Sequence, residues 1–242
     1  MKKKLTALAM VVVLGATAAI GGTLAYFTDT DSATNVMTTG KVDIKQNENG
    51  DAGFETQPLM PMVNKMEAGD ATIVDGMFNA KMKNVVDKVV TVTNEADAKY
   101  AENSNYDAYV RTILLFETAK EYEEGTDTVL RDGLEIFDTY IGVLSKGLTW
   151  MNETVTIDGQ EYVVAYRVYE DALAAGKTSE ASLKQIFLSP EADNEVAKLF
   201  GEDYKVLALS QGTQTAGFDK AADALDTAFG EITLANVAGW FK

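Results

Sequence analysis

The chain has 242 residues, of which 46% are hydrophobic and 24% charged, and it contains no histidine and no cysteine. The lack of these two residue types excludes disulfide bonds, thiol catalysis, histidine-based triads and the usual donors of catalytic zinc. The net charge of −16 disfavours binding to nucleic acid or to an anionic membrane through a basic patch, whereas the apolar content suffices for a sizeable core.

The first 25 residues are typical of an export signal. Three lysines at positions 2–4 form a positive n-region, and the uncharged apolar run 5–20 is shorter than a typical membrane span. A small-x-small cleavage site follows, and the residues around it are Thr23, Ala25, Tyr26 and Phe27. We therefore expect a secreted protein whose mature chain begins near residue 26, with an uncleaved membrane anchor as the alternative.

Residues 26–45 are predicted to form an extended N-terminal arm, and residues 46–242 a single body. The polar stretch 46–57 is expected to be the loop between them. Near the end of the arm, Val42 and Ile44 alternate with Asp43, so that the two apolar side chains can face a sheet while Asp43 faces water. The residues that we expect to act in a donated strand are Val36, Val42 and Ile44.

Alternating patterns predict most of the body to be strands. The segment 85–92 alternates as a strand with one buried face, and 107–117 is apolar on both faces, as expected of a central strand. Asp158 and Gly159 predict a type I′ turn between strands 150–157 and 160–169. Further strands are expected at 205–210 and 231–237.

Two helices are expected as short insertions between strands. The first has Ser189 as its N-cap and Pro190 as its first residue, and ends before Gly201. The second spans 218–229 and ends at Gly230. Short strands without regular alternation with helices predict an all-β fold with short helical insertions, an antiparallel two-sheet β-sandwich.

Candidate ligands for catalysis or for metal ions are all carboxylates or amides. Segments 29–31 and 47–51 offer clustered oxygens of the kind that Ca²⁺ takes, but neither fits an EF-hand, and we interpret both as solvated turns. No cofactor is therefore predicted, although Ca²⁺ binding stays open. A glycosidase pair would have to come from Glu117, Glu121, Glu123, Glu124, Glu135 and Glu161, and sequence spacing does not bring any two of them together. Trp150 and Trp240 are candidates for sugar contacts, or for ordinary core positions.

A pattern around the cleavage site resembles the signal of the TasA/camelysin family. Its residues, besides Ala25, Tyr26 and Phe27, are Gly22, Asp29, Asn35, Gly40, Val42, Asp43 and Ile44. Met37 and Thr39 are mild departures, because the family usually has Phe and Ala there. Looser similarities occur at 107–111 and 214–230. Members of this family carry signals that a dedicated signal peptidase of the SipW type reads.

The resemblance implies a jelly-roll sandwich exported by a Gram-positive-type bacterium to its surface or biofilm matrix. It implies polymerisation into fibres in which the arm of one subunit adds as a strand to the next, so that the partners are further copies and the signal peptidase. Contact with a membrane would come only through the uncleaved signal. The metallopeptidase activity described for some members is disfavoured here, because histidine and cysteine are missing. The alternatives are an arm that completes its own sandwich, a monomer that binds carbohydrate or Ca²⁺, and a secreted peptidase.

Overall fold

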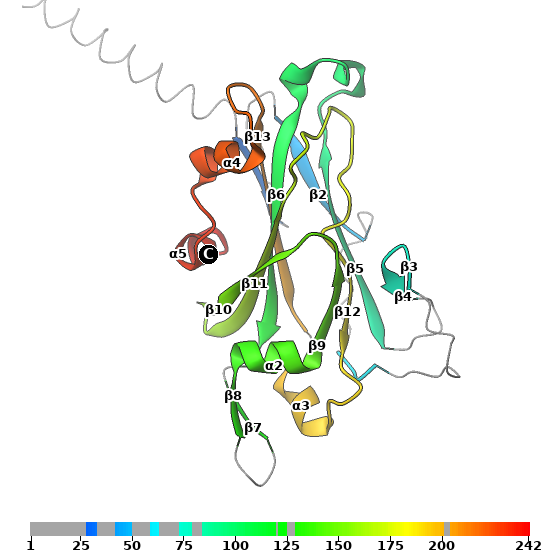
Figure 1. Cartoon of the computed structure of the whole chain (residues 1–242), viewed down its shortest axis with the longest axis vertical. Helices are drawn as coiled ribbons and strands as arrows, with labels where there is room; N and C mark the ends of the chain where they lie inside the picture. The colour runs from blue at the N-terminus through cyan, green and yellow to red at the C-terminus, as the bar shows by residue number, and fades with distance from the viewer. Residues whose placement is uncertain are drawn as a thin grey trace, which may run out of the picture.

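The structure is a computed structural model that describes residues 28–32, 42–49, 59–62, 73–78, 84–119, 121–124, 129–200 and 204–242. Two antiparallel sheets face each other, and short helices lie at the lower end and along one side (Figure 1). The predicted two-sheet β-sandwich with helical insertions is confirmed. Its jelly-roll connectivity stays a prediction. No helix in the described ranges combines the length and the apolar character needed to cross a membrane.

The larger sheet has five strands, and β6 runs through its centre. In spatial order the strands are β1 (Thr28–Ser32), β13 (Val206–Gln214), β6 (Ala108–Thr118), β11 (Gln160–Val168) and β10 (Thr149–Ile157). Every residue of β6 except Tyr109 is buried, because one face meets the second sheet and the other lies under the C-terminal helices. This confirms the prediction of a central strand.

The second sheet has four strands and is buried on one face. In spatial order they are β2 (Ile44–Glu48), β5 (Val85–Asn94), β12 (Leu183–Leu188) and β9 (Ile141–Ser145). The alternation expected in β5 is present, since Val90 and Val92 are buried. The loop predicted at 46–57 is wrong at its start, because β2 continues through Glu48 and pairs with β5. The strands β9 and β12 were not predicted.

Two small hairpins and two single turns of 3₁₀ helix lie outside the sheets. They are β3 (Ile73–Val74) with β4 (Met77–Phe78), β7 (Glu121–Glu124) with β8 (Val129–Asp132), η1 (Ala98–Tyr100) and η2 (Ser104–Tyr106). The predicted hairpin between β10 and β11 is confirmed. Its turn residues Asp158 and Gly159 have φ angles of 50° and 86°, the left-handed backbone that a type I′ turn requires.

The first two helices are set by their caps. Helix α2 (Gly133–Tyr140) begins with a capping box between Asp132 and Glu135 and was not predicted. Helix α3 (Asn194–Leu199) begins later than expected, because Asp193 and not Ser189 is the N-cap. The Asp193 carboxylate accepts hydrogen bonds from two backbone N–H groups of the first turn.

The last two helices cover the outer face of the larger sheet. Helix α4 (Ala221–Phe229) ends at Gly230 as predicted. The strand predicted at 231–237 is wrong, because Thr233 caps helix α5 (Leu234–Trp240). The apolar residues Leu234, Val237, Ala238 and Phe241 repeat at helical spacing and pack on the outer face of the sheet.

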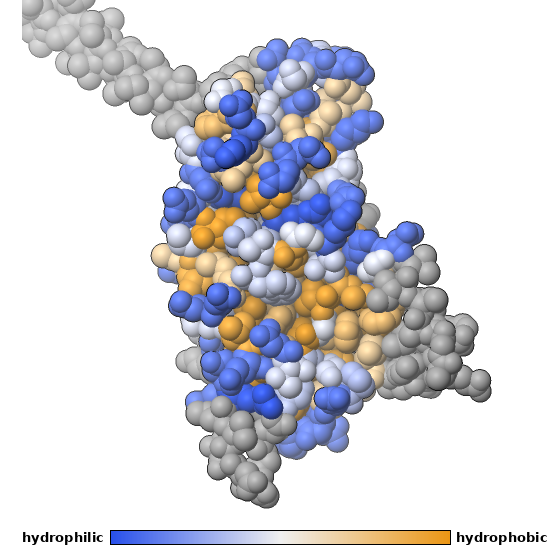
Figure 2. Space-filling view, in the orientation of Figure 1, coloured by the Kyte–Doolittle hydropathy of each residue, from blue (hydrophilic) through white to orange (hydrophobic). Residues whose placement is uncertain are grey.

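Figure 2 shows hydrophobic surface gathered across the middle of the molecule and mostly hydrophilic surface at its upper end.

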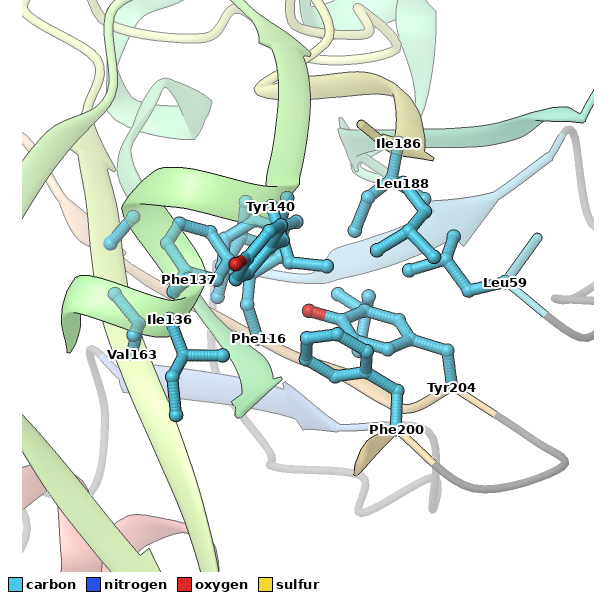
Figure 3. Packing of buried hydrophobic residues seen from close by; sticks show 14 of the residues in the cluster. Leu59, Phe116, Ile136, Phe137, Tyr140, Val163, Ile186, Leu188, Phe200 and Tyr204 are labelled. Atoms are coloured by element: carbon cyan, nitrogen blue, oxygen red, sulfur yellow. The ribbon is translucent and has the colours of Figure 1, made fainter. Parts of the chain in front are cut away.

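The main core lies between the sheets and is closed below by α2 and α3. Phe116 of the central strand packs 5.6 Å from the ring of Phe137 in α2 and 5.4 Å from that of Trp150. Figure 3 shows side chains from α2, from the second sheet and from the segment after α3 converging on the same space. At the upper end a smaller cluster contains Val42 and Ile44, and so connects the arm to the core.

Candidate functional site

The N-terminal arm supplies an edge strand to each sheet. β1 pairs antiparallel with β13, with Thr28 opposite Thr213 and Asp29 opposite Gly212, and β2 pairs with β5 on the other sheet. Among the described residues, both strands have a neighbouring strand on one side only. The arm therefore occupies sheet edges, the position where a strand can be exchanged with least disturbance of the remaining pairs.

Ile44 occupies a notch that Gly212 of β13 leaves open. A Cβ atom on Gly212 would lie 2.8 Å from Cγ2 of Ile44, closer than side chains approach one another. Val42 and Ile44 are 2% and 4% exposed, and they pack with Val92 and Val110. The prediction that these two arm residues face a sheet is confirmed, and Asp43 between them is exposed.

Gln46 continues the inward-facing row of β2 and binds β13 through polar contacts. The Ser210 hydroxyl donates to Oε1 of Gln46 at 2.7 Å, and the Gln46 amide donates to the carbonyl oxygen of Ala208 at 3.4 Å. Neither Gln46 nor Gly212 was among the residues predicted from the sequence. The signal for Gln46 was the alternation of inward-facing residues that continues after Ile44. The signal for Gly212 was its place within a strand, where a glycine often marks the close approach of another chain segment.

Arg111 is a fully buried charge on the outer face of the central strand. Its Nε donates to Gln211 at 2.7 Å, Nη1 to the Asp226 carboxylate at 2.8 Å and Nη2 to the Gly230 carbonyl at 2.8 Å. The Trp240 ring centroid lies 5.1 Å from the guanidinium carbon. Burial lowers the pKa of Arg111, and the hydrogen bond that it donates to Asp226 opposes that shift. These contacts attach α4 and α5 to the sheet.

Glu117, at the far end of the same strand, is a carboxylate in a largely apolar setting. Burial raises its pKa, against the hydrogen bond that it accepts from the Lys205 N–H at 2.8 Å. The Tyr204 hydroxyl donates to the Glu117 backbone carbonyl, and burial followed by the nearby Glu117 charge raises the pKa of Tyr204. These contacts hold the end of β6 to the start of β13 and form no evident catalytic pair.

The other carboxylates singled out in the sequence make structural contacts or belong to the β7 strand. Glu135 completes the α2 capping box, Glu161 accepts a hydrogen bond from Thr154, and Glu121, Glu123 and Glu124 lie on β7. Among the described residues, no group of three or more acidic side chains could hold a metal ion.

The two segments interpreted as solvated turns contribute strand residues, although Asn49 is a turn residue and residues 50–51 lie outside the described ones. Residues 29–31 belong to β1. Asn47 in β2 donates to the hydroxyls of Thr91 and Thr93, and Asn49 accepts from the Val89 N–H, so that both amides support the pairing with β5. The corrected interpretation is that residues 29–31 and 47–49 serve sheet formation.

Part of the predicted signal and donor-strand motif lies outside the described residues. These positions are Gly22, Thr23, Ala25, Tyr26, Phe27, Asn35, Val36 and Gly40. Of the remaining motif residues, Asp29 lies in β1, Val42 and Asp43 directly precede β2, and Ile44 begins it.

The sequence matches the family model of camelysin metallo-endopeptidase over residues 1–218. Neither the curated proteins nor the solved structures contain a match. The match covers both sheets and ends before α4, so that Arg111 lies within it and its partner Asp226 lies beyond it.

The family description implies a metal ion, but the donors of this chain do not fit a zinc site. Zinc in proteins is held mainly by histidine and cysteine, and the chain has neither. The described part of the chain brings together no cluster of carboxylates that could replace them. We therefore derive no catalytic step through a metal. The extent of the match nonetheless decides the family: the chain belongs to the camelysin metallo-endopeptidase family.

Proposed function

We propose that the chain is an exported structural subunit that polymerises into extracellular fibres by exchange of its N-terminal arm. In the fibre, β1 of one subunit would pair with β13 of the next, and the backbone hydrogen bonds of the strand would supply the affinity. The observation that carries the proposal is the pairing of β1 with β13 at the edge of the larger sheet. A strand from a second copy can form the same pairs in the same register.

The contacts next to β1 support a defined register for the exchanged arm. Ile44 of β2 fills the notch at Gly212, and Gln46 of β2 binds Ser210. Gly212 and Ser210 both lie on β13. Because side chains on a strand alternate, a shift by one residue would turn Ile44 away from the notch and place Asp43 there. An incoming arm would therefore be held in register by the fit of Ile44 against Gly212 and by the hydrogen bond between Gln46 and Ser210.

Signal cleavage would control this assembly. The arm directly follows the predicted cleavage site at Ala25, so that an uncleaved signal would keep its start at the membrane. A signal peptidase of the SipW type would release the arm, and the mature subunit would polymerise in the biofilm matrix or at the cell surface. The lack of histidine and cysteine favours this structural role over the peptidase role that the family description carries.

The proposal is tested by cysteine cross-linking in mature protein that begins at residue 26. Thr28 and Thr213 lie opposite each other, and the natural chain has no cysteine. A mixture of one protein with Thr28→Cys and another with Thr213→Cys should form disulfide-linked dimers under oxidising conditions if arms exchange. The control mixture pairs Thr28→Cys with Asp138→Cys, which places the second thiol on exposed α2, away from β13.

The double variant Thr28→Cys/Thr213→Cys tests the link to polymerisation. Oxidised as a monomer, it should stay monomeric, and a reductant should restore concentration-dependent fibres in electron micrographs. The competing candidate, a monomeric surface protein, rests on the fact that the arm already completes both of its own sheets. Monomers at every concentration, with equal cross-linking in both mixtures, would reject fibre assembly by arm exchange.

A further inference from the structure

The edge of the larger sheet opposite to β1 is only partly occupied. β10 begins at Thr149, opposite Tyr166, and so covers only part of β11. β11 continues to Val168, which pairs with Arg111 of β6 on its other side. Beyond Tyr166 this edge of β11 therefore has no neighbouring strand among the described residues.

Successive residues of β11 direct their backbone groups alternately toward β6 and away from it, and this alternation shows which groups lack a neighbouring strand. The Tyr169 N–H donates to the Val110 carbonyl at 3.1 Å, so that the backbone groups of Tyr169 point toward β6 and those of Val168 point away from it. Within the described ranges, no backbone hydrogen bond reaches the N–H or the C=O of Val168. Exposed backbone groups at a strand edge can pair with an additional strand.

A groove of about 660 Å³ lies over this open edge. Tyr166 and Val168 line it from β11, and residues 170–173 line it after that strand ends. Ser179, Glu180 and Ala222 of α4 also contribute to the lining. The groove is open to solvent, and its strand edge is the feature that β-strand addition uses.

Ionic and aromatic contacts hold the base of the groove in place. Arg167 pairs with the Glu180 carboxylate at 3.0 Å and lies 4.3 Å from the centroid of the Tyr169 ring. The Tyr169 hydroxyl donates to the Glu180 backbone carbonyl at 2.9 Å, and Lys146 binds the other Glu180 oxygen at 2.7 Å. Glu180 thus binds both Arg167 and Lys146, so that these three residues together keep one positive charge at the base of the groove.

Two exposed acidic residues lie at the rim of the groove. Glu170 and Asp171 are both exposed and line the groove. In the part of the chain that the structure describes, neither carboxylate has an ion-pair partner. An occupant that carries lysine or arginine would be attracted to these two exposed carboxylates.

We infer that this groove binds an extended, lysine- or arginine-bearing segment of another protein as an added strand. The segment pairs with Val168 and continues the line of β10, and its cationic side chains lie next to Glu170 and Asp171. This partner site is separate from the β13 edge used in the proposed fibre assembly. The subunit would thus have one edge for copies of itself and another for a basic partner.

Peptide binding to the mature protein tests the inference. The probe is a short fluorescent peptide of alternating lysine and valine with both ends blocked, and binding is followed by fluorescence anisotropy. The double variant Glu170→Gln/Asp171→Asn should weaken binding by about threefold to tenfold at low salt. The matched control Glu191→Gln/Asp138→Asn removes the same charge from exposed positions outside the groove and should weaken binding less than about twofold.

Two further measurements distinguish strand addition from general charge attraction. A peptide of the same sequence with alternate backbone nitrogens methylated should lose the binding, and hydrogen exchange at the Val168 amide should slow when the unmodified peptide is added. Equal weakening in the two double variants, unchanged Val168 exchange, or full binding of the methylated peptide would overturn the inference. Tighter binding of a peptide of residues 26–45 would overturn the assignment to a basic partner.

Discussion

Nη1 of Arg111 donates to Oδ1 of Asp226 at 2.8 Å, and this contact joins the central strand to a helix beyond the family match. The Arg111 side chain is 0% exposed, whereas that of Asp226 is 39% exposed. Hydrogen bonds to Gln211, Asp226 and the Gly230 carbonyl replace the hydration that the buried guanidinium has lost. The segment that contains α4 and α5 therefore supplies hydrogen-bond partners to the buried charge of Arg111 and also covers apolar residues of the sheet.

Loss of the Asp226 carboxylate should destabilise the protein. Asp226→Ala leaves the guanidinium with one charge partner fewer, and we expect a loss of about 1–2 kcal/mol of unfolding free energy, below the range for fully buried pairs because Asp226 is partly exposed. Urea denaturation measures this loss. Glu231→Ala, an exposed position nearby, is the control and should change little. Equal losses of unfolding free energy in Asp226→Ala and Glu231→Ala would show that the ion pair with Arg111 does not stabilise the fold.

Gly212 and Ile44 should be energetically coupled. Gly212→Ala places a methyl group 2.8 Å from Cγ2 of Ile44 and should cost about 1–3 kcal/mol of unfolding free energy. In the Ile44→Ala background the added methyl group has room, so that the same substitution should cost less. A double-mutant cycle by urea denaturation measures the coupling. Strictly additive effects would mean that Ile44 does not fill the notch.

Glu117 should make stability depend on pH. Burial raises the pKa of its carboxyl, so that the folded state binds the proton more tightly than the unfolded state does. Its stabilising contribution is complete below the ordinary glutamate pKa and is lost as the pH rises through the raised value. Relative to Glu117→Gln, the wild type should therefore lose unfolding free energy as the pH rises from below the ordinary glutamate pKa through the raised one.

The matched control for this titration is Glu153→Gln, at an exposed position on β10. Its stability difference from the wild type should change little with pH. The amide oxygen introduced by Glu117→Gln can still accept the hydrogen bond from the Lys205 N–H, which isolates the effect of the charge. A wild type that gains stability relative to Glu117→Gln over the same range would contradict the raised pKa.

Ala25 should control release of the arm. Ala25→Trp places a large side chain at the small position of the predicted cleavage site, so that the precursor should accumulate uncleaved. Leu24→Val, which changes the unrestricted middle position, is the control. Immunoblotting and N-terminal sequencing of the exported protein measure the outcome, with Tyr26 or Phe27 expected as the first mature residue. Normal processing of Ala25→Trp would place the cleavage site elsewhere.

Local signals in the sequence predicted the elements that depend on neighbouring residues. Asp158 and Gly159 determine the hairpin because their positive φ angles suit a type I′ turn, and Gly230 ends α4 for a related reason. The capping pair Asp132 and Glu135 was an equally local signal for α2 that the sequence analysis passed over. The burial of β6 followed from its apolar character on both faces.

Only the tertiary structure decided which distant segments meet. Residues 231–237 were expected to be a strand and form most of α5 instead, because the outer face of the larger sheet offers apolar residues to a helical stripe. The sequence by itself determined the sandwich class and the lack of zinc donors, and it predicts the export signal and the extended arm. It did not determine that Ile44 meets Gly212 or that β11 is left with an open edge, because contacts between residues far apart in the chain depend on the packing of whole sheets and not on local patterns.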